Sequence, residues 1–186
     1  NILNHAKLDP TIINGGVLNS IGSSAKLGKS DWGLIESDES DGSFLRIPFN
    51  YSIITNIDKE HLDFYKNINN LKKKFVDFIN KTPSLGKSFI CLDDKNIKDI
   101  LPRVKNKNYY TYGLSKNSNF YICNINHNKN YCKFDVKIKI PGNQKIIRGL
   151  NIPLLGLHNI KNATSALAVA FSIGVPDKII KLGLKN

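Results

Sequence analysis

The sequence predicts an α/β protein, with a mostly parallel sheet flanked by helices and an antiparallel flap at the edge of that sheet. Two apolar, β-rich runs at 32–35 and 51–55 are each followed by a stretch rich in acidic residues, a pattern typical of buried parallel strands whose carboxyl ends form a site. From there to residue 112, strand and helix patterns alternate. Beyond residue 119 apolar and polar residues alternate, which indicates antiparallel strands with one solvated face.

The first thirty residues contain short elements separated by turn signals. Residues 1–9 are expected to be the tail of a helix closed by Asp9-Pro10, because proline disfavours helix at the preceding residue. Residues 11–14 predict a β-branched strand, and Gly15-Gly16 a turn. The run GSSAKLGKS (22–30) resembles a phosphate loop, but five residues separate its glycines where the motif requires four, so we do not assign one.

The rest of the chain completes the sheet. A helix is predicted over 67–81, where apolar residues recur at helical spacing with lysines between them. The remaining expected elements are strands at 88–92 and 108–112, a short helix ending near Pro102, flap strands at 119–126, 131–140 and 145–152, a buried helix at 158–171 ended by Gly174, and a last helix opening at Pro176-Asp177.

Length and composition limit the class of protein. A chain of 186 residues can bury a real core as one domain. No apolar run approaches the length of a transmembrane span. The three cysteines have no metal-binding spacing, which favours free thiols in a reducing compartment. Because the sequence contains no methionine, we expect a fragment of a longer protein.

The net charge of +12 is unevenly placed. Residues 1–65 hold nine acids and five bases, whereas residues 66–186 hold six acids and twenty-two bases. Almost all the bases are lysines, in a chain equally rich in asparagine and isoleucine, as A/T-rich codons would give. Only three are arginine, the preferred reader of bases and phosphates. A solvated lysine surface is therefore favoured; a basic nucleic-acid-binding module remains the alternative from another class, with steep salt dependence as its sign.

An acidic cluster follows the first β-rich run. Glu36 ends that run, and four acids fall within six residues, at 36, 38, 39 and 41. A carboxylate at a strand end is how nucleotide-hydrolysing folds hold Mg²⁺. The alternative is that Glu36 only caps the turn, but four crowded acids favour a cation that relieves their repulsion.

His61 lies among Asp58, Glu60 and Asp63, just past the second run. There it could ligate a metal, act as an acid or base near neutral pH, or pair with a carboxylate. Imidazole by itself favours Zn²⁺ or Mn²⁺ over Mg²⁺. Residue chemistry thus indicates a metal–acid site without selecting the metal.

His158, Asn159 and Asn162 open the buried helix, and the two asparagines share a face. Asparagine at a helix start usually caps the helix, so capping is the favoured interpretation. The alternative is that the amides read the edge of a purine, whose donors and acceptors suit asparagine.

Four segments in this order resemble the Mur ligases: LDPTIINGG (8–16), ESDESDGSF (36–44), TNIDKEHLDFY (55–65) and GLHNIKNATSA (156–166). Together they extend over almost the whole chain. The form NID-x-EHLD-x-Y is most similar to the member that joins L-alanine to UDP-N-acetylmuramate. The member that recycles murein tripeptide is the alternative within the family, and its motif around the histidine differs.

The resemblance implies a P-loop-type central domain and ATP-driven amide formation in cytoplasmic peptidoglycan synthesis. In such enzymes the carboxylate of UDP-N-acetylmuramate takes the γ-phosphoryl group of ATP, and the amine of L-alanine attacks the acyl phosphate. By the same resemblance, Glu36 and His61 would bind Mg²⁺, and His158, Asn159 and Asn162 would lie against adenine. Asn56 matches an asparagine beside the metal–substrate site.

The chain also departs from the family pattern. Residues 1–186 match an incomplete central domain, and the phosphate loop, the N-terminal UDP-binding domain and the C-terminal domain are expected outside them. Leu157 stands where the family often has arginine. We therefore expect the chain to be inactive by itself.

Overall fold

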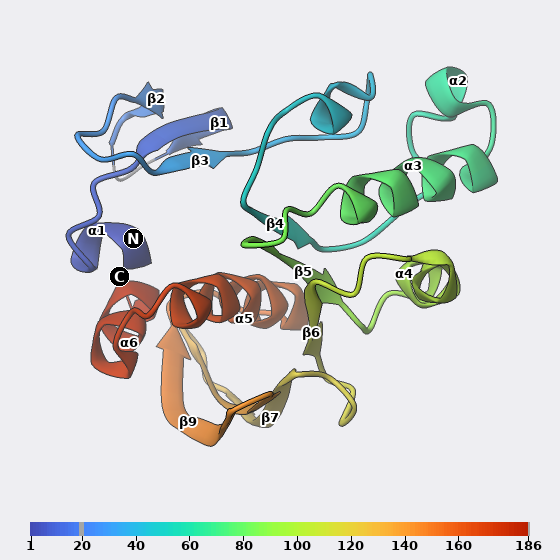
Figure 1. Ribbon diagram of the computed structural model, residues 1–186. Helices are drawn as coiled ribbons and strands as arrows, with labels where there is room; N and C mark the ends of the chain where they lie inside the picture. The colour runs from blue at the N-terminus through green and yellow to red at the C-terminus, as the bar shows by residue number, and fades with distance from the viewer. Residues whose placement is uncertain (19–20, 186) are drawn as a thin grey trace.

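The computed structural model describes residues 1–18 and 21–185, and in them the strands form two sheets (Figure 1). One sheet has three strands in the order β2-β1-β3, and the other has six in the order β4-β5-β6-β7-β8-β9. The strands are β1 (Thr11–Leu18), β2 (Ser23–Lys26), β3 (Gly33–Ile35), β4 (Tyr51–Ile54), β5 (Lys87–Cys91), β6 (Tyr109–Gly113), β7 (Phe120–His127), β8 (Cys132–Ile140) and β9 (Asn143–Ile152).

The six-stranded sheet confirms the predicted fold class. Its strands β4 to β7 pair in parallel, and β7, β8 and β9 pair in antiparallel fashion. Strand β7 therefore belongs both to the parallel core and to the flap. Strand β8 buries alternate residues, as its period-two pattern predicts.

Helices cover this sheet (Figure 1). Helix α5 runs along it and contacts β5, β6, β7 and β8. The predicted amphipathic helix is α3, which Asn67 caps by accepting the N–H of Asn70. The helices are α1 (Ile2–His5), α2 (Leu62–Tyr65), α3 (Ile68–Asn80), α4 (Lys95–Ile100), α5 (Leu157–Ser172) and α6 (Asp177–Lys185), with 3₁₀ turns at Ser43–Leu45 and Leu101–Arg103.

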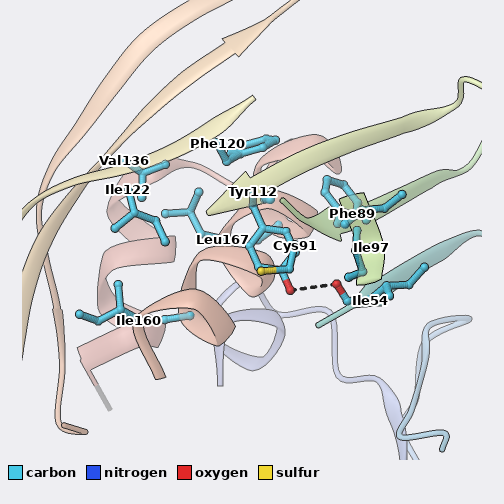
Figure 2. Packing of buried hydrophobic residues seen from close by; sticks show 14 of the residues in the cluster. Ile54, Phe89, Cys91, Ile97, Tyr112, Phe120, Ile122, Val136, Ile160 and Leu167 are labelled. Carbon is cyan, nitrogen blue, oxygen red and sulfur yellow. Dashed lines mark hydrogen bonds between the residues drawn. The ribbon is translucent and has the colours of Figure 1, made fainter. Parts of the chain in front are cut away.

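Part of the core lies between α5 and the six-stranded sheet (Figure 2), and α3 and α4 bury further apolar side chains in the same cluster. Phe89, Phe120 and Leu167 are fully buried there. The rings of Phe89 and Phe120 meet edge to face, with their centroids 6.2 Å apart. The α5 residues that face the strands are mainly alanine, leucine and isoleucine, which lets the helix lie close to the sheet.

The cysteines are free thiols, as the sequence predicts: Cys91 and Cys132 are buried and Cys123 is half-buried. Burial raises the pKa of the Cys91 thiol, which disfavours the reactive thiolate. Among the residues that the structure describes, no helix is both long and apolar enough to cross a membrane.

The N-terminal third differs from expectation. The turn predicted at Gly15-Gly16 is wrong, because β1 continues through both glycines with an irregular register between Ile13 and Leu18. The segment 22–30 is not a phosphate loop: it contains β2, which was not expected and which pairs with β1. The predicted helix before Asp9 ends earlier, at His5.

The burial predicted for residues 32–35 is also wrong. Strand β3 forms there, but all three of its residues are exposed, and it pairs with β1 rather than joining the main sheet. By contrast, β4 buries Ser52 and Ile54 and pairs in parallel with β5, as predicted. The two β-rich runs therefore end at the edges of different sheets.

Candidate functional site

Glu36 directly follows β3 and is fastened to β1. Its N–H donates to the carbonyl of Ile13 at 2.8 Å, and its Oε2 accepts the N–H of Gly15 at 2.7 Å. A Cβ at Gly15 would lie 3.3 Å from that oxygen, so glycine allows this close approach. The Glu36 carboxylate remains exposed and has lone pairs left for a further partner.

Residues 36–42, which we call the acidic loop, are held in shape by hydrogen bonds to carboxylates of the loop itself. Asp38 accepts the N–H of Ser40 at 2.9 Å and its hydroxyl at 2.6 Å. These bonds, and secondarily the nearby His61, hold the pKa of Asp38 below its ordinary value. The pKa of Asp41 is lowered in the same way, by hydrogen bonds from the residue two places on. Both carboxylates therefore stay ionised at neutral pH.

His61 opens the turn that leads into α2, and its side chain is exposed. Its φ of +54° is left-handed, and its carbonyl accepts the N–H groups of Phe64 and Tyr65. The hydroxyl of Tyr65 donates to the carbonyl of Glu39, and a Cβ on Gly42 would lie 3.3 Å from the Phe64 ring. The structure thus places the acidic loop beside the His61 turn, although β3 and β4 belong to separate sheets.

Asn56 lies just past β4, on the same stretch as His61. Its side chain is exposed, and its Nδ2 donates to Oδ2 of Asp58 at 2.6 Å. The next residue is held firmly, since the Ile57 side chain is buried and its carbonyl accepts the Asn96 amide at 2.6 Å. In the described ranges 1–18 and 21–185, no three His, Cys, Asp or Glu side chains gather as ligands for a metal ion.

The start of α5 does not show the capping favoured from sequence. Its N-cap is Gly156, without a side-chain hydrogen bond. Asn159 instead donates its Nδ2 to the carbonyl of Leu155 at 2.8 Å, and Asn162 is exposed. His158 is exposed beside Gly156, where a Cβ would lie 2.9 Å from the imidazole. These three side chains therefore face the loop before α5 and solvent.

Asp93 is a residue of this region that sequence reasoning missed. It follows β5, and its carboxylate accepts the N–H groups of Leu114 and Ser115 just past β6. A Cβ on Gly113 would lie 2.7 Å from that carboxylate. Oδ2 of Asp93 also lies 3.9 Å from Nζ of Lys161 on α5. Its position directly after an apolar run, like that of Glu36, is the signal that could have identified it.

Tyr112 is a second missed residue. Its buried hydroxyl donates to the carbonyl of Ile54 at 3.2 Å, the bond drawn in Figure 2, and also contacts Ser165 of α5. Burial raises the pKa of Tyr112, so the phenol remains a donor. Asp93 and Tyr112 together hold the first half of α5 against the carboxyl ends of the parallel strands.

A cleft of about 780 Å³ separates β3 from β4. Both are edge strands of their sheets. Asp38 and Glu39 of the acidic loop also contribute to its walls. Its apolar lining comes from the two strands, α1, α3, α5 and the segment before β4: Leu3, Trp32, Leu34, Ile35, Phe44, Ile47, Phe49, Tyr51, Ile53, Ile54, Phe75, Phe78, Val169 and Ile173.

Comparison with known proteins shows similarity along the whole chain. Over its full length the chain is 60% identical to the UDP-N-acetylmuramate–L-alanine ligase of Pelagibacter ubique, and the match covers 40% of that protein. It is 40% identical to the ligase of the same name from Rhizorhabdus wittichii, and that match covers 39% of the relative. Its fold matches the crystal structure of the UDP-N-acetylmuramate–alanine ligase MurC from Thermotoga maritima with a TM-score of 0.81 at 22% identity, covering 99% of this chain and 40% of that one.

The chain thus spans about 40% of the length of the curated relatives it matches. The sequence model of the Mur ligase middle domain matches residues 30–170, a range that includes the acidic loop, His61 and the start of α5. The chain therefore belongs to the Mur ligase middle-domain family.

Proposed function

We propose that the full-length protein joins L-alanine to UDP-N-acetylmuramate at the expense of ATP, in peptidoglycan synthesis. The observation that carries this proposal is the 60% identity, along all 186 residues, to a ligase of that name. Relatives of the same name at 37–40% identity support it. We place the reaction in the cytoplasm, because ATP is available there and free buried thiols suit a reducing compartment.

Within this proposal Glu36 and His61 hold Mg²⁺, beside Asn56. Mg²⁺ usually keeps several waters and binds through one or two protein ligands plus substrate phosphates. Two protein ligands therefore fit a site in which no three such side chains gather within the described residues. The exposed Glu36 carboxylate is a suitable hard ligand, whereas the imidazole is softer than Mg²⁺ prefers. Bound there, the ion would neutralise charge on the ATP phosphates.

We assign His158, Asn159 and Asn162 to the adenine. The absence of side-chain capping at Gly156 supports this assignment, because the asparagine amides are not used to close the helix. An amide offers one acceptor and two donors, which match the edge of adenine. Asp93 lies 3.9 Å from Lys161, and the Tyr112 hydroxyl contacts Ser165, so the first half of α5, which carries the three side chains, lies against the sheet.

The proposal also includes parts of the protein beyond this chain. We expect the phosphate loop and its strand before residue 1, with a UDP-binding domain before them and another domain after residue 186. The cleft between β3 and β4 supports this expectation, since two edge strands with apolar side chains face a common space. A strand placed there would pair with both edges and join the two sheets.

The test of function is phosphate release by the full-length protein. The assay contains ATP, Mg²⁺ and UDP-N-acetylmuramate, with and without L-alanine. We expect alanine-dependent release that falls by at least 100-fold in Glu36→Gln and in His61→Ala, the scale usual for loss of electrostatic stabilisation. Glutamine keeps an acceptor for the Gly15 N–H, so the fold around it is retained.

Matched controls separate site effects from general ones. Asp99→Asn removes a half-exposed carboxylate that pairs with Lys72, and His127→Ala removes an exposed histidine from the flap. Both should retain release. Release that persists in Glu36→Gln and His61→Ala would refute the site assignment. A folded wild-type protein that releases no phosphate in response to L-alanine would refute the proposed function.

A further inference from the structure

Tyr65 connects the two segments that carry the proposed metal ligands. Its side chain is 4% exposed, and its hydroxyl donates to the carbonyl of Glu39 in the acidic loop. These two residues are 26 positions apart and are not joined by a sheet. The bond therefore fixes a distance that the strands themselves leave open.

The backbone of Tyr65 is hydrogen-bonded through both its N–H and its carbonyl. Its N–H donates to the carbonyl of His61 at 3.2 Å, and its carbonyl accepts the Asn70 amide of α3 at 2.8 Å. Because His61 has a left-handed φ of +54°, the short turn from 61 to 65 holds it in a conformation that non-glycine residues rarely adopt. Any restraint on Tyr65 is thus passed directly to His61.

The acidic loop is shaped to receive this turn. Gly42 has a left-handed φ of +72°, and a Cβ there would lie 3.3 Å from the Phe64 ring and 3.7 Å from the Tyr65 hydroxyl oxygen. The Tyr65 hydroxyl is thus packed against the acidic loop at the point where it donates to the carbonyl of Glu39.

We propose that Tyr65 is a positioning residue, whose bond to Glu39 holds the acidic loop against the His61 turn and so sets the affinity of the site for a divalent cation. The inference rests on the proposed function, in that it takes Glu36 and His61 as the ligands. The role assigned to Tyr65 requires no contact of its own with substrate or metal. Its role is to keep the two ligand-bearing segments in register before the cation and ATP bind.

The test is Tyr65→Phe in the full-length protein, because phenylalanine keeps the buried ring and removes only the hydroxyl. Mn²⁺ binding is measured by electron paramagnetic resonance without substrates, and the rate is measured across a Mg²⁺ titration. We expect about five- to tenfold weaker Mn²⁺ binding, the effect of losing one hydrogen bond. The apparent Mg²⁺ requirement should rise by the same factor, with kcat recovered at saturating Mg²⁺.

Tyr112→Phe is the matched control, since it removes the hydroxyl of another buried tyrosine that donates to a carbonyl. It should lower the melting temperature about as much as Tyr65→Phe does and leave Mn²⁺ affinity unchanged. Should Tyr65→Phe not fold, Phe64→Ala trims a ring that is 55% exposed and lies against the same loop. We expect two- to threefold weaker Mn²⁺ binding there.

The outcomes distinguish this inference from the proposal on which it rests. Wild-type Mn²⁺ affinity in Tyr65→Phe, or equal weakening in Tyr112→Phe, would overturn the role of Tyr65 alone. A wild-type protein that does not bind Mn²⁺ would refute the metal site itself, and this role with it. If Tyr65→Phe binds Mn²⁺ weakly and saturating Mg²⁺ restores its kcat, the result supports a positioning role for Tyr65 rather than a general loss of stability.

Discussion

Two short apolar strands, one in each sheet of this protein, have very different surroundings. Strand β5 of the six-stranded sheet buries four of its five residues. Strand β3 of the three-stranded sheet is also apolar, yet its three residues are all exposed, with Leu34 at 50% and Ile35 at 44%. Both are short strands in parallel pairs.

The difference comes from what lies on each sheet. Helix α5 packs along β5 to β8 (Figure 1), whereas β3 faces the cleft that separates it from β4. The apolar sequence of a strand indicates that other parts of the protein cover it. It does not indicate whether those parts come from the same stretch of chain. The exposed side of β4, where Ile53 is 41% exposed, faces the same cleft. The exposed residues of β3 and the exposed side of β4 are thus two walls of one space.

The largest expected effect on this contrast comes from a pair of side-chain truncations in the 186-residue chain. Phe89→Ala removes a fully buried ring, and should lower the free energy of unfolding by about 3–5 kcal/mol. Leu34→Ala removes a half-exposed side chain and should lower it by less than about 1 kcal/mol. Urea denaturation measures both.

Repeating Leu34→Ala in the full-length protein sharpens the comparison. If a strand fills the cleft there, Leu34 is buried, and its loss should lower the free energy of unfolding by about 2–5 kcal/mol. An unchanged small effect in the full-length protein would contradict the proposed filling of the cleft. A large effect in the short chain would contradict the contrast between the sheets.

Much of the six-stranded sheet was predictable, because its signals are local. Period-two alternation identified β8, and helical spacing with a polar face identified α3. The partner of β3 was not predictable in this way. A strand of three residues carries little pairing information, and its pairing with β1 joins residues that are 22 positions apart in the chain.

The residues of the candidate site also differ in how far local sequence signals could identify them. Glu36 stands out because it follows an apolar run directly, and His61 because it lies among three acids just past another such run. Asp93 follows an apolar run as Glu36 does, so the same signal could have identified it. Tyr65 does not stand out, since its importance lies in a bond to a carbonyl group 26 residues away. The capping interpretation of Asn159 failed because Gly156 ends the preceding loop and leaves no cap position for an asparagine.

A pair of glycines tests the same contrast with a smaller expected effect. Gly113 at the end of β6 has a φ of +141°, and a Cβ there would lie 2.7 Å from the Asp93 carboxylate. Gly33 in β3 has nothing within 4 Å of such a Cβ. Gly113→Ala should therefore lower the free energy of unfolding by about 1–3 kcal/mol, whereas Gly33→Ala should leave it unchanged or raise it slightly. Equal melting temperatures for the two variants would contradict the tight packing inferred at the carboxyl edge.

The smallest expected effect is a pH dependence confined to the three-stranded sheet. Asp9 accepts Nζ of Lys26 at 2.5 Å and the N–H of Lys29 at 3.0 Å, and these bonds, the Lys26 bond first, lower its pKa from the ordinary 3.8. Because the unfolded chain then binds the proton more tightly, this contribution to stability is present above pH 3.8 and is lost as the pH falls through the folded pKa.

Lys26→Met isolates that contribution. Nuclear magnetic resonance titration of the Asp9 carboxyl should show its pKa rising towards 3.8 in the variant. Lys145→Met, which breaks the exposed pair with Asp177 beside the six-stranded sheet, should leave the Asp9 pKa unchanged. The change in stability will be slight, since exposed ion pairs contribute little. An Asp9 pKa that stays low without Lys26 would mean that the Lys29 N–H suffices to hold this turn. The Lys26 side chain would then add nothing to the stability of the segment that connects α1 to the three-stranded sheet.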